Sequence, residues 1–483
     1  MTPPRIQALR GSHATPPAAP VRPPAAVASA SPAFYLTMVF VFVVYARFPE
    51  IMDMVTGSAV HSVRIIVLLA LLAAMLFGGA VRAVFSKVGI GLLAFTAWLC
   101  VCTPFSIWRG GSFQMLRDSW ALSLFSFVII ASSVQGLEQC RKIMFSLAAA
   151  TIFIQFFAVM MRRVQEGRVA LLGGTLGNAN YLAMMLLMGA PFCLFVIRTK
   201  PGKSLFKLAC VAMLVFIPVT VATTGSRGGL VTLAVMFLLY FWPLPVSQKV
   251  VVAVAALMLA VFAIAWSTRS ALDRYKTIFL SSDQSQLSES ERSALDSTGL
   301  RKELLRSSLQ LTLRHPLLGV GPGMFAAANA DYTEETTGRP NWNAWHETHN
   351  TFTQLSCEDG LPGLLLYCLT LLFCFRIVFS IEKRVRQYPA MSAVRHMAFA
   401  LRLALIAFIG TSLFASNAYM YYFPMLAGLC VAVDRAAAAQ FAQMSAASEQ
   451  PDTRPQAAKT LAQLRPGRPA GSGAMAWKRP LPR

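Results

Sequence analysis

Three short polar motifs interrupt an otherwise apolar chain, and the first of them suits phosphate binding. It is TTGSRGG at 223–229, which sets Arg227 among glycines. A guanidinium beside exposed backbone N–H groups can bind a phosphate, because glycines let a ligand approach the backbone closely. The alternative is that Arg227 extends its charged end from a helix terminus into water. The sequence favours the phosphate site and leaves the alternative open.

The second motif, HETHN at 346–350, suits proton transfer. Its imidazoles, His346 and His349, stand at positions i and i+3. A zinc-binding H-E-x-x-H helix needs i and i+4, so no metal site is expected. A neutral imidazole with a pKa near 6.5 can instead accept a proton from a hydroxyl group, with Asn350 orienting the ring. An ordinary surface role is the alternative, and the sequence does not decide which of the two histidines acts.

The third motif, GNANY at 177–181, supplies two amide side chains at the start of an apolar run. Asn178 and Asn180 can cap the helix that begins there or line a cavity, and both interpretations stay open.

The elements that must position these motifs are helices in a membrane. Of the 483 residues, 56% are hydrophobic and only 13% are charged, which is well below the charged fraction of about a quarter in soluble domains. Apolar runs of roughly 17 to 22 residues recur, long enough to cross about 30 Å of hydrocarbon as helices. We therefore expect an all-α polytopic membrane protein of about twelve spans. Their predicted ranges are 32–48, 62–79, 88–105, 117–134, 143–161, 178–197, 204–223, 228–244, 249–267, 358–380, 396–414 and 417–435.

The formal net charge of +22 comes mainly from Lys and Arg in the connections between apolar runs. The positive-inside rule explains this distribution with both termini in the cytoplasm, so a nucleic-acid partner is not expected. Arg168 lies in a short outer loop that runs against the rule. That loop either weakens the predicted topology or meets an anionic ligand.

The predicted organisation has five parts. Residues 1–31 are Pro- and Ala-rich and are expected to be disordered and cytoplasmic, whereas 32–267 hold the first nine spans. Residues 268–357 form one long outer loop, and 358–435 hold the last three spans. Residues 436–483 are expected to be a disordered, basic cytoplasmic tail.

The long outer loop is expected to contain short amphipathic helices. Its Ser-rich first part should be mobile, and Ser297 should cap a helix that displays leucines on one face and Arg301 on another. The glycine-rich GVGPG at 319–323 should end this helix in a tight turn.

The order of GNANY, TGSRGG, a helix with Arg301, HPLLGVGPGMF and HETHNTFTQLSCEDGLPG resembles the O-antigen ligase and polymerase superfamily of membrane glycosyltransferases, over roughly residues 65–435. The resemblance implies glycan transfer from undecaprenyl diphosphate to an acceptor hydroxyl, with inversion and without a metal or other cofactor. It implies that Arg227 and Arg301 hold the diphosphate and that His349 is the general base. Arg168 is a looser diphosphate candidate, and the supporting candidates are Asn178, Asn180, His346, Asn350 and Glu358.

The resemblance also implies the partners and the location. The expected partners are an undecaprenyl-diphosphate-linked glycan, a lipid A-core or polysaccharide acceptor, and membrane lipid, and the expected location is the bacterial inner membrane with the long loop in the periplasm. A polymerase that extends a carrier-linked chain is the main alternative. A secondary transporter is a further one, although we find no repeated halves and few charges within the spans.

Overall fold

The computed structural model describes residues 31–57, 62–77, 79–161, 163–165, 168–171, 175–199, 202, 204–267, 269–276, 289–338, 345–388 and 391–449. The chain forms two compact units, Met1–Ala436 and Ala437–Arg483. Of the second unit, only the end of one helix is described. The predictions of disorder for residues 1–30 and 450–483 lie outside the described residues.

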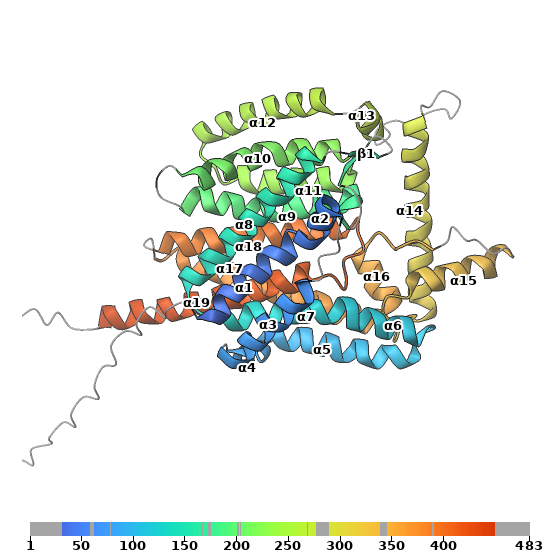
Figure 1. Ribbon diagram of the computed structural model, residues 1–483, viewed down its shortest axis with the longest axis horizontal. Coiled ribbons are helices and arrows are strands. Elements are labelled where there is room, and N and C mark those ends of the chain that lie inside the picture. Colours follow the sequence, from blue (N-terminus) through green and yellow to red (C-terminus); the bar gives the residue numbers. More distant parts are fainter. Residues whose placement is uncertain are drawn as a thin grey trace, which may run out of the picture. The chain divides into compact units, whose positions relative to one another are not determined.

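Helices account for nearly all of the described chain (Figure 1). The first half contains α1 (Pro32–Tyr45), α2 (Phe48–Thr56), α3 (Ser62–Phe77), α4 (Ala80–Val84), α5 (Lys87–Cys102), the 3-10 turn η1 (Thr103–Phe105), α6 (Arg109–Met115), the π-helical turn η2 (Leu116–Trp120), α7 (Ala121–Ser133), α8 (Leu137–Met160), the 3-10 turn η3 (Thr175–Gly177) and α9 (Ala179–Thr199). The second half contains α10 (Leu205–Thr223), α11 (Arg227–Phe241), α12 (Val246–Trp266), α13 (Arg269–Lys276), α14 (Glu289–Arg314), α15 (Phe325–Thr337), α16 (Thr351–Glu358), α17 (Gly360–Val385), α18 (Ser392–Ser412) and α19 (Tyr422–Glu449).

All twelve predicted apolar runs fall on helices. Within the described residues, nine helical segments are long and apolar enough to cross a membrane, and a tenth is added if α1 and α2, bent by 61°, form one span. The remaining two runs fall on shorter apolar helices, Ile65–Phe77 and Arg227–Phe241. The apolar window of α12 is only 6% buried, so its hydrophobic side chains face a lipid-like solvent. The prediction of an all-α polytopic membrane protein is confirmed.

Two predicted boundaries are wrong. Helix α14 begins at Glu289, so Ser297 lies inside the helix and does not cap it. Helix α19 continues to Glu449, whereas disorder was expected from residue 436. Residues 436–449 are rich in Ala and Gln, and residues 289–296 contain Glu, Arg, Ala and Leu; all of these favour helix even without an apolar face.

A short hairpin is the one addition to the helical architecture within the described residues. Strand β1 (Arg163–Gln165) pairs antiparallel with β2 (Arg168–Ala170), with Val164 opposite Val169. The hairpin lies between α8 and α9 in the chain and fixes the position of Arg168.

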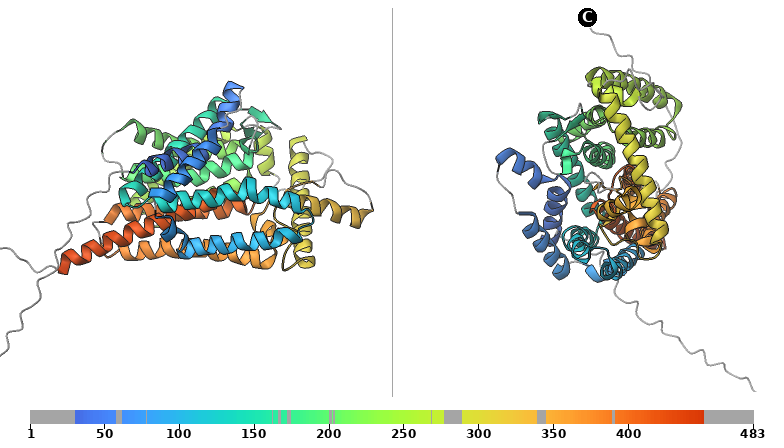
Figure 2. Two further views of the ribbon diagram at one scale, coloured as in Figure 1. Left: turned by 60° about the horizontal axis from the view of Figure 1, so that its bottom comes forward. Right: turned by 90° about the vertical axis from the view of Figure 1, so that its right-hand side faces the viewer.

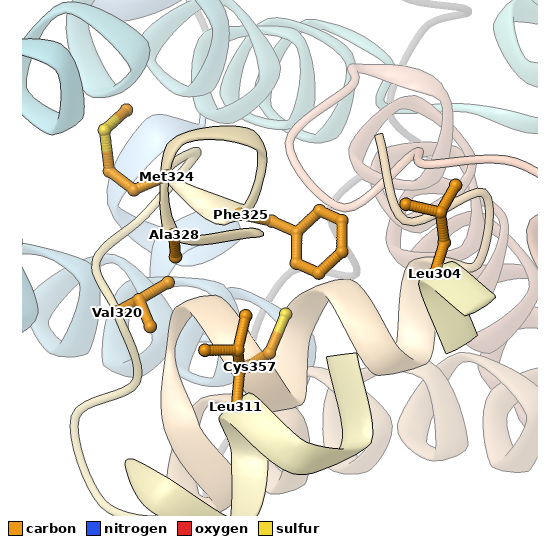
Figure 3. Packing of buried hydrophobic residues seen from close by; sticks show 7 residues of the cluster. All are labelled: Leu304, Leu311, Val320, Met324, Phe325, Ala328 and Cys357. Carbon is orange, nitrogen blue, oxygen red and sulfur yellow. The ribbon is translucent and has the colours of Figure 1, made fainter. Parts of the chain in front are cut away.

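Helix α14 lies across one end of the bundle. Figure 1 shows it running transverse to α5 and α17, and the end-on view in Figure 2 shows it crossing the ends of the other helices. A buried cluster anchors it there: Leu304 and Leu311 of α14 pack with Phe325 of α15 and Cys357 of α16 (Figure 3). This apolar contact joins the helix that carries Arg301 to the segment that follows His349.

The HPLLGVGPG segment packs directly on the start of α17. Val320 N–H donates to the Cys357 carbonyl (2.8 Å), and Leu361 N–H donates to the Pro316 carbonyl (2.8 Å). A Cβ on Gly360, at φ +72°, would lie 1.9 Å from the Leu317 carbonyl oxygen. The close approach of the two backbones therefore requires glycine, which explains why these two motifs occur together.

Candidate active site

One cavity collects most of the candidate residues. Its volume is about 410 Å³, and it opens among β2, the start of α9, α14 and the segment that precedes α16. The lining residues are Arg168, Ala170, Gly177, Asn178, Ala179, Asn180, Ser297, Leu300, Arg301 and His349. Five predicted site residues thus meet in a single space, which we call the arginine cavity.

Arg168 is fixed by two hydrogen bonds. Its Nε donates to the carbonyl oxygen of Thr224 (2.9 Å), and its Nη2 donates to Oδ1 of Asn180 (3.0 Å). Thr224 belongs to the TTGSRGG motif and Asn180 to GNANY. Arg168 therefore connects two motifs that are more than forty residues apart in the sequence, and its guanidinium stays at the cavity wall.

Asn178 caps α9 and also lines the arginine cavity. Its Oδ1 accepts a hydrogen bond from the backbone N–H of Asn180 (2.9 Å), and its carbonyl accepts the first helical bond, from Leu182. Asn180 lines the same cavity through the side chain that binds Arg168. The two alternatives for GNANY, helix capping and cavity lining, are thus both present.

Arg227 stands at the first position of α11, after the capping residue Ser226, whose Oγ accepts from Gly229 N–H. Its Nη2 donates to the Thr298 hydroxyl of α14 (2.7 Å), beside Leu300 and Arg301 of the cavity wall. The expectation that the neighbouring glycines admit a ligand is wrong for Gly228. A Cβ there would lie 2.4 Å from the Phe414 ring, so this glycine admits a side chain of the protein.

His349 has an unusual backbone. Its φ is +53°, and only Arg47 shares a positive φ among the described non-glycine residues. The backbone N–H of His349 donates to the hydroxyl of Ser416 (3.0 Å), and α16 begins two residues later. A left-handed conformation is costly for a residue with a Cβ and is maintained only where its surroundings fix it.

The imidazole of His349 is held in its neutral form. Burial, together with the nearby Arg301 and His346, lowers its pKa to about 4. A neutral imidazole has a nitrogen lone pair available as a proton acceptor. His349 thus has the protonation state that a general base needs at neutral pH.

Asn350 acts on the backbone around His349. Its Oδ1 accepts from the N–H groups of Phe352 and Thr353, and its Nδ2 donates to the Leu413 carbonyl (3.3 Å). Both polar ends of the side chain are therefore bound to backbone groups, and Asn350 caps α16. His346 is half-buried and lies near enough to affect the pKa of His349, but it does not line the arginine cavity.

Glu358 lies outside the arginine cavity. Its carboxylate accepts hydrogen bonds from the N–H groups of Gly323 (3.1 Å) and Phe325 (3.0 Å) and from the hydroxyl of Tyr419 (2.7 Å). Burial raises its pKa to about 7. Its contacts fix the GVGPG turn against α16, so the structure gives this residue a role in the fold near the site.

Several residues of the site were not predicted from the sequence. Ser416 binds the backbone of His349, and Thr298 binds Arg227. Glu50 of α2 accepts a hydrogen bond from Thr175 N–H, just before GNANY. For Ser416, the sequence signal that could have pointed to it is the polar SNAY run at 416–419, which separates two apolar runs and resembles GNANY in composition.

The described residues contain no group of three or more His, Cys, Asp or Glu side chains close enough to share a metal ion. The arginine cavity instead combines two guanidiniums with amide groups and a neutral imidazole. Such a set can bind a doubly charged anion and accept a proton beside it.

A comparison with protein families finds a match for part of the chain. Residues 208–368, about a third of the chain, match the family model described as O-antigen ligase. The matched segment runs from α10 into α17 and includes Arg227, Arg301 and His349. No curated protein matches the chain.

Proposed function

We propose that this chain, whose residues 208–368 match the O-antigen ligase family model, acts in surface polysaccharide biosynthesis and transfers a glycan from undecaprenyl diphosphate to an acceptor hydroxyl group. The transfer takes place at the periplasmic face of the bacterial inner membrane. The observation that carries this proposal is the arginine cavity, where Arg168, Arg301 and His349 line one space.

The diphosphate of the donor binds to the arginines. Guanidinium groups bind phosphate oxygens through paired, charge-assisted hydrogen bonds. Arg168 is already oriented by Thr224 and Asn180, so little side-chain entropy is lost on binding. Arg227 adds positive charge at the first turn of α11, where the helix dipole also favours an anion.

His349 acts as the general base. Its neutral imidazole takes the proton of the acceptor hydroxyl as the hydroxyl oxygen forms a bond to the anomeric carbon. The bond from that carbon to the diphosphate breaks, and the diphosphate leaves with the electron pair. Arg168, Arg301 and Arg227 stabilise the charge that develops on it. Direct displacement inverts the anomeric centre.

The test is transfer by the purified protein supplied with an undecaprenyl-diphosphate-linked glycan, with and without lipid A-core. We expect the glycan to be transferred to lipid A-core when that acceptor is supplied, and we expect no new product without it. Longer carrier-linked chains in its absence would identify a polymerase of the same chemistry. If the donor is consumed neither with lipid A-core nor without it, the proposal is contradicted.

A further inference from the structure

We propose that a second cavity, lined by Glu347 and Thr348 immediately before His349 in the chain, binds a sugar ring of the acceptor. This inference rests on the proposed glycan transfer. The second cavity has a volume of about 180 Å³, and we call it the acidic cavity. Its lining residues are Met115, Ser119, Gly323, Phe325, Ala326, Glu347, Thr348, Gln354, Glu358, Ser416, Tyr419 and Met420.

The two cavities differ in charge. The described lining of the acidic cavity contains two carboxylates, Glu347 and Glu358, and no Arg or Lys. This lining offers a diphosphate no cationic partner, whereas the hydroxyl groups of a neutral sugar can hydrogen-bond to carboxyl oxygens. The hydroxyl of Ser119 adds a further hydrogen-bonding group.

The remaining lining suits the less polar faces of a sugar ring. Met115, Phe325 and Met420 present apolar surface to the same space. Binding sites for small organic molecules commonly combine such apolar walls with a few placed polar groups. A volume of about 180 Å³ corresponds to about six water molecules. The acidic cavity therefore has room for a single ring, and the rest of the glycan must extend away from it.

The position of the acidic cavity relative to the proposed base is fixed by Ser416. The Ser416 hydroxyl accepts the backbone N–H of His349 and lies 3.0 Å from the Thr348 hydroxyl. Thr348 and Ser416 line the acidic cavity, whereas His349 lines the arginine cavity. The proposed ring site and the imidazole that must receive the proton are thus carried by consecutive residues of one short segment, which Ser416 holds.

The walls of the acidic cavity are formed before any ligand binds. Tyr181 of α9 donates from its hydroxyl to Glu347 (3.2 Å), and the side chain of Glu358 is fixed by three hydrogen bonds from Gly323, Phe325 and Tyr419. Fixed polar groups bind a ligand without first paying an ordering cost, which favours them as recognition elements.

A pair of neighbouring substitutions tests the inference. Ala326→Leu adds side-chain volume to the wall of the acidic cavity, whereas Ala327→Leu makes the same change on the adjacent, half-buried residue of α15 that does not line it. The assay uses the acceptor to which the wild-type protein transfers glycan. We expect Ala326→Leu to raise the acceptor KM about tenfold or more, whereas the donor KM should stay within about twofold of the wild-type value. Ala327→Leu should leave both KM values within about twofold.

A second variant covers the case in which Ala326→Leu does not fold. Glu347→Gln keeps the size of the side chain and removes its charge, and we expect it to raise the acceptor KM severalfold with an unchanged donor KM. An unchanged acceptor KM in a folded Ala326→Leu or Glu347→Gln protein would overturn the acidic cavity as the acceptor site. Absence of transfer by the wild-type protein would instead refute the proposed function, so the two failures are distinct.

Discussion

At His349, three features act together on one side chain. The residue has a left-handed backbone, which costs of the order of 1–3 kcal/mol. It is also partly buried and close to Arg301. Ser416 and the cap formed by Asn350 keep the backbone in place. The surroundings thus favour a neutral imidazole directed into the arginine cavity.

The first prediction concerns the pH dependence of transfer. A base must be deprotonated, and the pKa of His349 is lowered to about 4, so the imidazole is already neutral throughout the range above that value. Measured as kcat/KM, which reports the free enzyme, the rate should stay level from about pH 8 to about pH 5 and fall only near pH 4. An ordinary histidine would instead lose half its activity near pH 6.5.

A bound donor should change this profile in a defined direction. The diphosphate neutralises the charge of Arg301, which contributes to the low pKa of His349. The acid limb of kcat, which reports the enzyme–substrate complex, should therefore lie at a higher pH than the acid limb of kcat/KM. Identical limbs would argue against contact between the donor phosphate and Arg301.

The choice between the two histidines is also testable. His346 does not line the arginine cavity, so His346→Ala should retain transfer within about tenfold of the wild-type rate. Loss of transfer in His346→Ala, with activity retained in His349→Ala, would reverse the assignment of the base.

Among the elements, the contact between HPLLGVGPG and the start of α17 gives a prediction about stability. Gly360→Ala adds a Cβ 1.9 Å from a backbone oxygen at a positive φ, so the variant should show a large loss of thermal stability in detergent. Gly299→Ala is the matched control, because a Cβ at Gly299 of α14 meets nothing within 4 Å. It should raise stability by roughly 0.5–1 kcal/mol, the usual difference in helix propensity. Equal effects of the two changes would contradict the described packing.

The bend between α1 and α2 supports the start of α9, which lines the arginine cavity. Arg47 binds Glu50 (2.7 Å) and lies over the rings of Tyr421 and Tyr422, while Glu50 accepts the N–H of Thr175 (3.2 Å). Glu50→Ala should raise the donor KM severalfold, because the turn before Asn178 loses its anchor, and kinetics at varied donor concentration would measure the effect.

The control for Glu50→Ala is a similar ion pair away from the site. Glu138 and Arg141 also pair at i,i+3, but with side-chain exposures of 51% and 38%. Exposed ion pairs contribute little to stability, and this pair is away from the site. Glu138→Ala should therefore leave the donor KM unchanged. A donor KM that responds equally to Glu138→Ala and Glu50→Ala would exclude a specific role for the bend.

At the scale of the whole molecule, the orientation in the membrane remains a prediction. Lys302 lies on α14, at the end of the bundle that carries the arginine cavity, and Lys383 lies in the last turn of α17. In a Cys100→Ser background, Lys302→Cys should react with a membrane-impermeant thiol reagent from the periplasm. Lys383→Cys should react only after the inner membrane is opened. The reverse pattern would invert the proposed topology.

The helices could be predicted because long apolar runs must satisfy their backbone groups internally in lipid. Arg168 could be singled out because its short outer loop runs against the positive-inside rule, and His349 because the HETHN motif suits proton transfer, whereas Arg301 was implied by the family resemblance. Their meeting in one cavity depends on contacts that periodicity does not encode. The bond from His349 to Ser416, for instance, joins residues 67 positions apart.

The details that were wrong have a common cause. Asn350 was expected to orient an imidazole, but it caps α16, and Gly228 was expected to admit a ligand, but it admits Phe414. In both cases a helix or a neighbouring side chain of the protein itself uses the residue. Sequence motifs indicate which residue types are needed, and the packing around them determines whether a ligand or the fold uses them.

The central claim is that His349 removes the acceptor proton while the arginines hold the donor, and one comparison tests it directly. Donor binding and transfer are measured on the same purified His349→Ala protein, with the undecaprenyl-diphosphate-linked glycan and lipid A-core. We predict donor binding within about twofold of the wild-type protein, and transfer reduced by about a hundredfold or more. Retained transfer in His349→Ala would contradict the account.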